Sequence, residues 1–265
     1  MKVLGLDTAT STAGIALVDD DRVLGEARHD TSARGADLLV AIDRVCRDAG
    51  VAPGALDAIA VGAGPGSFTG LRIGMATAKG IAFAARRPLW AVSSLAALAD
   101  DAARELAAQH RLTHADGVIC AVLDARRGEV FAGCFRHGAA LAAERVLAPA
   151  ALAPWVAELV AQAQGPQAGR STPATPAAPP APAEPTVPPV CYAGDAIDAF
   201  RDVLGPLGAD GGWLAARTPS GSAVARRALA GARVDITRAG APTYIRPSEA
   251  EVMYPDGVPG ALRRR

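Results

Sequence analysis

A glycine-rich segment between an apolar run and a long helical pattern constrains the fold of this chain most strongly. Residues 62–74 read GAGPGSFTGLRIG and follow the apolar run 58–61. A strand–turn–helix unit of this kind brings bare backbone N–H groups close to a phosphate or to a tightly packed neighbour. The Walker A pattern needs a Lys after its glycines, and the dinucleotide pattern needs a third Gly at Ser67. The segment matches neither and predicts a close-approach turn of another kind.

The order of the predicted elements indicates an α/β fold with mixed sheets and flanking helices. The first half is predicted to contain strands at 3–6, 13–18, 22–27, 56–62 and 88–92 and helices at 36–49, 70–86 and 94–108. The second half again begins with a strand, 118–123, that ends at Asp124, as the first strand ends at Asp7. A strand at 129–135, a third strand across 140–147 and a helix at 150–163 are predicted to follow it. The matched aspartates favour duplication of one fold unit, although any two β-meanders look broadly alike.

The domain boundaries follow from this repetition. We predict a first lobe over 1–108, a smaller second lobe over 109–240 and a C-terminal tail over 241–265. The Pro/Ala-rich tract 165–189 has almost no charge and one large apolar residue, so we expect a disordered insertion in a loop. After this tract we predict strands at 190–193 and 212–215 and helices at 195–204 and 219–231. Whether the last helix packs against the first lobe is left open.

Charge and cysteine usage narrow the class of function. The chain has 27 basic and 27 acidic side chains, whereas a protein that binds nucleic acid unaided usually has a basic excess. Its four cysteines show no CxxC spacing and lie in apolar segments, as expected of buried thiols in a reducing compartment. No secretory signal or membrane span is evident, so we expect a cytoplasmic protein without membrane contact.

Two strand-end carboxylates, Asp7 and Asp124, could coordinate a phosphate-bound Mg²⁺, as in sugar or acetate kinases, or could simply cap local turns. The loop after Asp124 lacks the tandem glycines of a phosphate cradle, so the predicted phosphate site is degenerate. Its candidate residues are Asp7, Thr8, Gly64, Gly66, Ser67 and Asp124. His110 and His114 share a helical face, but no third ligand is evident, and we predict no metal site.

Four segments resemble the TsaB (YeaZ) family. They are residues 6–10 (LDTAT), 64–74 (GPGSFTGLRIG), 123–131 (LDARRGEVF) and 242–246 (PTYIR). The resemblance implies an actin/Hsp70-like (ASKHA) fold built from duplicated RNase-H-like units. It also implies a non-catalytic subunit that supports transfer of the threonylcarbamoyl group to N6 of adenosine 37 in ANN-decoding tRNAs. An ATP-dependent small-molecule kinase that uses Asp7 and Asp124 is the alternative.

The resemblance implies partners as well. The catalytic relative TsaD would form a heterodimer with this chain, the ATPase TsaE would join them, and tRNA would be contacted indirectly. TsaD carries a His-Met-Glu-Gly-His metal motif whose two histidines correspond here to Ser94 and Leu98. Leu98 cannot ligate a metal, and Ser94 is predicted to cap the following helix. ATP and metal are therefore expected in the partner subunits, with no cofactor bound by this chain alone.

Small residues on the helix 70–86 suggest where a partner helix could approach. Gly70, Gly74 and Ala78 form one stripe, and residues 76, 80 and 84 form another. One stripe should pack on the home sheet, and the family implies that the other joins helix 36–49 in a seam with TsaD. The predicted partner-interface residues are Leu38, Leu39, Ile42, Val45, Gly70, Arg72, Ile73, Gly74, Thr77 and Ala78. A homodimer of the isolated chain through the same seam stays an open alternative.

Overall fold

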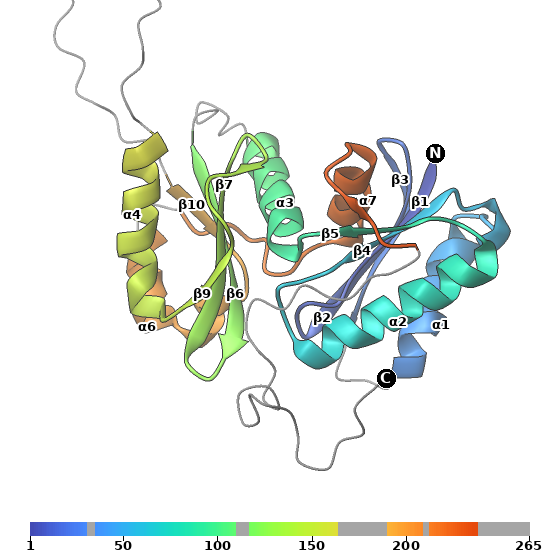
Figure 1. The fold of residues 1–265 in the computed structure, drawn as a ribbon, viewed down its shortest axis with the longest axis horizontal. Helices are drawn as coiled ribbons and strands as arrows, with labels where there is room; N and C mark the ends of the chain where they lie inside the picture. Colours follow the sequence, from blue (N-terminus) through green and yellow to red (C-terminus); the bar gives the residue numbers. More distant parts are fainter. Residues whose placement is uncertain (31–34, 110–116, 164–189, 209–211, 238–265) are drawn as a thin grey trace, which may run out of the picture.

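The computed structural model describes residues 1–30, 35–109, 117–163, 190–208 and 212–237 (Figure 1). The predictions for the tract 165–189, for the pair His110 and His114, for the segment 242–246 and for the tail 241–265 lie outside these residues.

The first sheet has six strands in the order β11-β5-β4-β1-β2-β3. The first three strands form an antiparallel meander, β4 and β5 continue the sheet in parallel to β1, and β11 runs antiparallel to β5. The bounds are β1 (Lys2–Asp7), β2 (Thr12–Asp19), β3 (Arg22–Asp30), β4 (Ala58–Gly62), β5 (Leu89–Val92) and β11 (Val234–Asp235).

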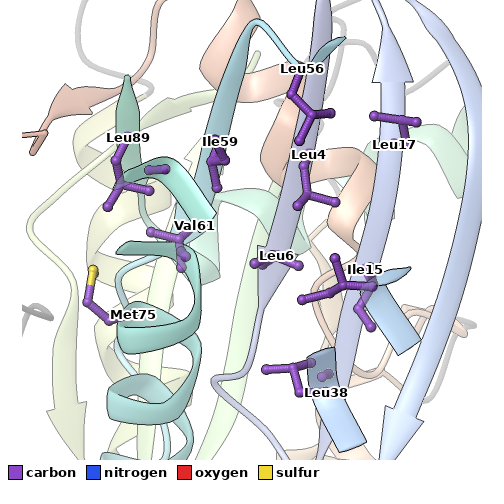
Figure 2. Close-up of a cluster of buried hydrophobic side chains, with 14 of the residues drawn as sticks. Leu4, Leu6, Ile15, Leu17, Leu38, Leu56, Ile59, Val61, Met75 and Leu89 are labelled. Carbon is purple, nitrogen blue, oxygen red and sulfur yellow. The ribbon is translucent and has the colours of Figure 1, made fainter. Parts of the chain in front are cut away.

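Helices cover both faces of the first sheet because its central strands place apolar side chains on both faces. On one face α1 (Gly35–Asp48) and α2 (Phe68–Ala85) cover a cluster that includes Leu4, Leu6 and Met75 (Figure 2). On the other face α7 (Gly221–Leu229) packs on β1 and β2, so the chain returns to the first sheet after passing through the second.

Glycines let α7 lie unusually close to the first sheet. A Cβ added to Gly5 would lie 2.0 Å from the carbonyl oxygen of Gly221, and one added to Gly14 would lie 2.5 Å from that of Pro219. Because those neighbours are backbone atoms, they cannot move aside cheaply. The short distance between the helix start and the strands therefore depends on side chains being absent at these positions.

The second sheet follows the order β10-β6-β7-β8, with β9 also paired to β7. It is covered on one face by α3, which lies between the two sheets, and on the other by α4, α5 and α6 (Figure 1). The bounds are α3 (Ser94–Ala108), β6 (Val118–Arg126), β7 (Glu129–Arg136), β8 (Ala139–Ala140), β9 (Arg145–Leu147), α4 (Leu152–Ala163), β10 (Val190–Ala193), α5 (Ala196–Ala199) and α6 (Arg201–Leu204). Single 3₁₀ turns lie at Pro53–Ala55, Pro149–Ala151 and Gly205–Gly208.

The second half departs from the predicted elements in three places. The predicted helix 195–204 is broken at Phe200, whose φ of −128° is not helical. The predicted strand 212–215 is only a single bridge between Tyr192 and Trp213, and the expected third strand is split into β8 and β9. β11 was not predicted, because a strand of two residues is too short to show the alternation of apolar and polar side chains.

None of the helices described is both long enough and apolar enough to cross a lipid bilayer.

Candidate functional site

The Asp7 carboxylate at the end of β1 is enclosed by the chain itself. Its side chain is 1% exposed, and its Oδ1 accepts the backbone N–H of Ala9 at 2.8 Å. Its Oδ2 accepts the hydroxyl of Ser94 at 2.6 Å, and Ser94 Oγ in turn accepts the N–H of Gly64 at 3.2 Å. Each carboxylate oxygen therefore has a partner within the protein, which connects β1, the glycine-rich turn and α3.

Gly62 and Gly66 let the glycine-rich turn pack directly against residues 7–9. A Cβ added to Gly62 would lie 1.8 Å from Oδ2 of Asp7, and one added to Gly66 would lie 2.5 Å from Ala9 Cβ. Real Cβ atoms do not approach other heavy atoms this closely, so glycine is required at both positions. These contacts place the chain's own atoms where a phosphate cradle would need open space.

The helical glycines of the motif serve the same close approach. A Cβ on Gly70 would lie 2.2 Å from the carbonyl oxygen of Thr8, and one on Gly74 would lie 2.1 Å from Thr8 Oγ1. Thr8 Oγ1 also donates to the carbonyl oxygen of Gly70 at 2.8 Å. The stripe formed by Gly70, Gly74 and Ala78 therefore faces the home fold.

The start of α2 is fixed by Ser67, whose hydroxyl oxygen accepts the backbone N–H of Gly70 at 3.2 Å. The cap lets the helix begin at Phe68, two residues earlier than predicted. Gly64 is buried, Gly66 is half-buried and Ser67 is exposed. Three residues of the predicted phosphate site thus form the turn that closes over Asp7.

Burial raises the pKa of Asp7 from 3.8 to about 6, against the opposing effect of its hydrogen bonds from Ser94 and Ala9. The folded state thus holds this proton more tightly than the unfolded chain. Protonated Asp7 therefore adds to the free energy of unfolding. This contribution is complete at pH values below the unfolded pKa of 3.8 and is lost as the pH rises through the folded pKa of about 6.

The variant Asp7→Asn is expected to remove this pH dependence, because its amide can accept from Ala9 and donate to Ser94 without ionising. Relative to the variant, the wild-type chain should lose about 1 kcal/mol of unfolding free energy between about pH 5 and about pH 7.5. Urea denaturation at the two pH values measures the difference. Parallel stability curves for the two proteins would show that the Asp7 proton is not linked to folding.

Asp124, the matching acid of the second sheet, has different partners. Its Oδ1 accepts the backbone N–H of Arg126 at 2.7 Å, and its Oδ2 lies 3.0 Å from the Arg126 guanidinium. Its own N–H donates to Asp195 Oδ1 at 2.9 Å, and burial raises the pKa of Asp195 to about 6. Within the described part of the chain Asp7 and Asp124 are not hydrogen-bonded to each other, and each has its own set of partners.

Asp195 was missed by the sequence reasoning, although a signal was present. It follows β10, which runs parallel to β6, and the carboxyl ends of parallel strands lie at the same edge of a sheet. A second acid beside Asp124 could have been expected from that order.

The two positions that the resemblance aligns with histidines, Ser94 and Leu98, are buried here. Leu98 is fully buried in the cluster between α3 and the second sheet, and Ser94 binds Asp7. The prediction that Ser94 caps α3 was wrong by one residue, because Ser93 is the cap and accepts the N–H of Ala96 at 3.1 Å. Across the described ranges, no group of three or more His, Cys, Asp or Glu side chains is placed to hold a metal ion.

The structure corrects part of the predicted partner interface. Six of its residues are buried within this chain and are therefore not exposed to a partner in this structure: Leu38, Ile42, Val45, Gly70, Gly74 and Ala78. The remaining four are exposed or half-buried: Leu39, Arg72, Ile73 and Thr77. The error has one cause, since the helical pattern gives the spacing of a stripe and not the direction it faces.

The stripe that does face outward on α2 contains residues that the prediction left out. Ala76, Gly80 and Ala84 are exposed, and beside them the Phe83 side chain is 88% exposed. On α1, which covers the same face of the sheet, Leu39 is 51% and Val40 is 67% exposed. These exposed apolar side chains lie on two helices that cover the same face of the first sheet. We call residues 76, 80, 83 and 84 the α2 outer face.

The two helix-covered mixed sheets, with an acid at the end of each leading strand, define a protein of the actin/Hsp70-like (ASKHA) class. The family model described as "TsaD: tRNA N6-adenosine threonylcarbamoyltransferase" matches residues 33–244. The chain belongs to this family, and within it to the TsaB (YeaZ) group.

The individual relatives agree with this placement. TsaB of Bacillus subtilis is 38% identical over 141 residues, which cover 52% of this chain and 56% of that protein. TsaB of Escherichia coli is 34% identical over 131 residues, which cover 49% and 53%. The matched region thus spans about half the length of these curated relatives. The solved structure of YeaZ from Pseudomonas aeruginosa has 28% identity and a TM-score of 0.62 and covers 92% of this chain and all of that chain, 100%.

The kinase alternative is not favoured. It requires Asp7 to reach a metal-bound phosphate, but both oxygens of Asp7 are engaged inside the chain. The relatives named above are tRNA threonylcarbamoyladenosine biosynthesis proteins.

Proposed function

We propose that this chain is a non-catalytic subunit that supports transfer of the threonylcarbamoyl group to N6 of adenosine 37 in ANN-decoding tRNAs. TsaD would be its catalytic partner, TsaE would join the pair as an ATPase, and ATP and metal would be bound by the partner subunits. The observation that carries the proposal is the closed turn over Asp7, whose carboxylate oxygens and surrounding space are taken by the chain itself.

The α2 outer face supports a docking role. A helix presenting alanine and glycine lets a partner helix approach to a short interaxial distance, and an aromatic beside that stripe can serve as an anchor. Phe83 has this position. The six buried residues of the original interface prediction are not part of the proposed surface, whereas Leu39, Arg72, Ile73 and Thr77 remain candidates at its edge.

The likeness to TsaD supports the choice of partner. The region matched by the TsaD family model includes both α1 and α2. A relative that has the same two helices can present a similar face, and two similar faces pack together about an approximate two-fold axis. A second copy of this chain has the same face, so the isolated protein could use it for a homodimer that TsaD replaces.

The proposal is tested by mixing the purified chain with TsaD and following the mixture by size-exclusion chromatography with light scattering. We expect a one-to-one complex, and no binding of labelled ATP by the chain alone at micromolar concentration. Separate elution of the two proteins, or micromolar ATP binding with turnover by the chain alone, would contradict the proposal.

A further inference from the structure

Two of the four cysteines lie directly opposite each other in the second sheet. Cys120 of β6 and Cys134 of β7 are partners in the antiparallel register, and their Sγ atoms are 3.1 Å apart. Both side chains are fully buried on the face that α4 covers. Cys191 lies on the opposite face of this sheet, and Cys46 lies under α1 in the first sheet's core.

The strand register suits a covalent bond between the two sulfurs. Residues directly opposite in an antiparallel pair have Cα atoms about 4.5 or 5.5 Å apart, and both values lie within the range of about 4.4–6.8 Å that disulfides span. The sulfurs need to approach by only about 1 Å to reach bonding distance. The pair can therefore close by side-chain movement, with the backbone of both strands left in place.

We propose that Cys120 and Cys134 form an oxidation site at which a small peroxide-class oxidant converts the two thiols to a reversible disulfide. One thiolate attacks hydrogen peroxide, so that an S–O bond forms, the O–O bond breaks and hydroxide leaves. The second sulfur then attacks the sulfenic sulfur, so that the S–S bond forms, the S–O bond breaks and water leaves. The two sulfurs lose two electrons in total, the peroxide oxygens gain two, and both thiol protons end in water.

The surroundings of the pair set its rate and its product. Burial raises the pKa of the Cys120 thiol well above its usual value, so little thiolate is present near neutral pH and oxidation is slow. Among the described residues, the outer side of β7 pairs only with the short strands β8 and β9, so local opening at this edge gives a small oxidant access. Once either sulfur is oxidised, the other stands beside it, and ring closure precedes further oxidation.

The test uses the reduced full-length chain treated with hydrogen peroxide, unfolded in an alkylating reagent, digested and mapped by mass spectrometry. We expect one linked peptide pair that joins Cys120 to Cys134, formed faster as the pH is raised. Dithiothreitol should return all four cysteines to alkylatable thiols. Full alkylation of Cys120 and Cys134 after peroxide, or a linkage that involves Cys46 or Cys191, would overturn the proposal.

Matched variants separate the pair from general cysteine chemistry. The double variant Cys46→Ser/Cys191→Ser should form the linkage at an unchanged rate. The variant Cys134→Ala should form none and should carry Cys120 on to the sulfinic acid, which dithiothreitol does not reverse. If Cys134→Ala does not fold, Cys120→Ala gives the same test with Cys134 as the remaining thiol. A linkage in either single variant would contradict the assigned pairing.

Discussion

Replacing Gly74 with alanine is expected to lower the free energy of unfolding by about 1–3 kcal/mol, because the new methyl group would overpack a closed contact. Its Cβ would lie 2.1 Å from Thr8 Oγ1 and 3.2 Å from Thr8 Cβ, so the whole threonine side chain would have to move. Thr8 is itself buried and hydrogen-bonded to Gly70, which leaves it little freedom to do so. Chemical denaturation followed by circular dichroism measures the loss.

Gly80 provides the matched control, since it lies in the same helix and, apart from that helix's own backbone, no atom of the described residues lies within 4 Å of an added Cβ. Gly80→Ala should raise the free energy of unfolding by up to about 1 kcal/mol, the usual gain of helix propensity. The opposite signs at two glycines six residues apart distinguish close packing from a general effect of glycine on the helix. If Gly74→Ala were as stable as Gly80→Ala, the motif would not be the packing device described above.

Replacing Phe83 with aspartate is expected to weaken binding to TsaD by at least about 30-fold, which corresponds to about 2 kcal/mol for loss of an aromatic anchor. The side chain is 88% exposed in the isolated chain, so its removal should change the chain's own stability by no more than about 0.5 kcal/mol. Isothermal titration with purified TsaD measures the affinity, and thermal unfolding checks the fold.

The control for this variant is Val203→Asp on α6, which places the same charge at another exposed apolar residue. α6 covers the second sheet on the face away from α3, whereas α2 covers the first sheet (Figure 1). This control should bind TsaD as the wild type does. Equal affinities for all three proteins would remove the α2 outer face from the proposed interface.

Much of the fold could be predicted from local patterns. Apolar runs bounded by turns predicted most strands of both sheets, though not β11 or the division into β8 and β9. Helical spacing predicted α1, α2 and α3 to within two residues. The glycine-rich motif indicated a close approach of backbone, which the contacts with Asp7, Thr8 and Ala9 confirm. These features are encoded by residues close together in the chain, so local sequence patterns are enough to predict them.

The direction of the small-residue stripes could not be predicted in the same way. Both stripes of α2 have the same spacing and similar residues, and only the contact of Gly70 and Gly74 with Thr8 decides which one is buried. Adjacent residues on α1 show the same limit, since Leu38 is buried and Leu39 is exposed. Such choices depend on contacts between segments about sixty residues apart, which a local pattern does not contain.

The different surroundings of Asp7 and Asp124 could not be predicted from the sequence either. Asp7 ends β1 and is enclosed by the glycine-rich turn and Ser94, whereas Asp124 lies two residues before the end of β6 and pairs with the exposed side chain of Arg126. The difference arises because a glycine-rich turn follows β4 beside Asp7, and among the described residues no such turn lies beside Asp124. The similar strand pattern therefore does not give the two acids the same surroundings.

We propose that this chain catalyses no reaction at its strand-end acids and acts by binding TsaD through the α2 outer face. Transfer of labelled threonylcarbamoyl groups to tRNA, assayed with TsaD, TsaE and ATP in the presence or absence of the chain, tests it most directly. We predict no product from the chain alone, full product from the complete set, and product lost with Phe83→Asp but retained with Val203→Asp. Modified tRNA from the chain alone, or undiminished product with Phe83→Asp, would contradict the account.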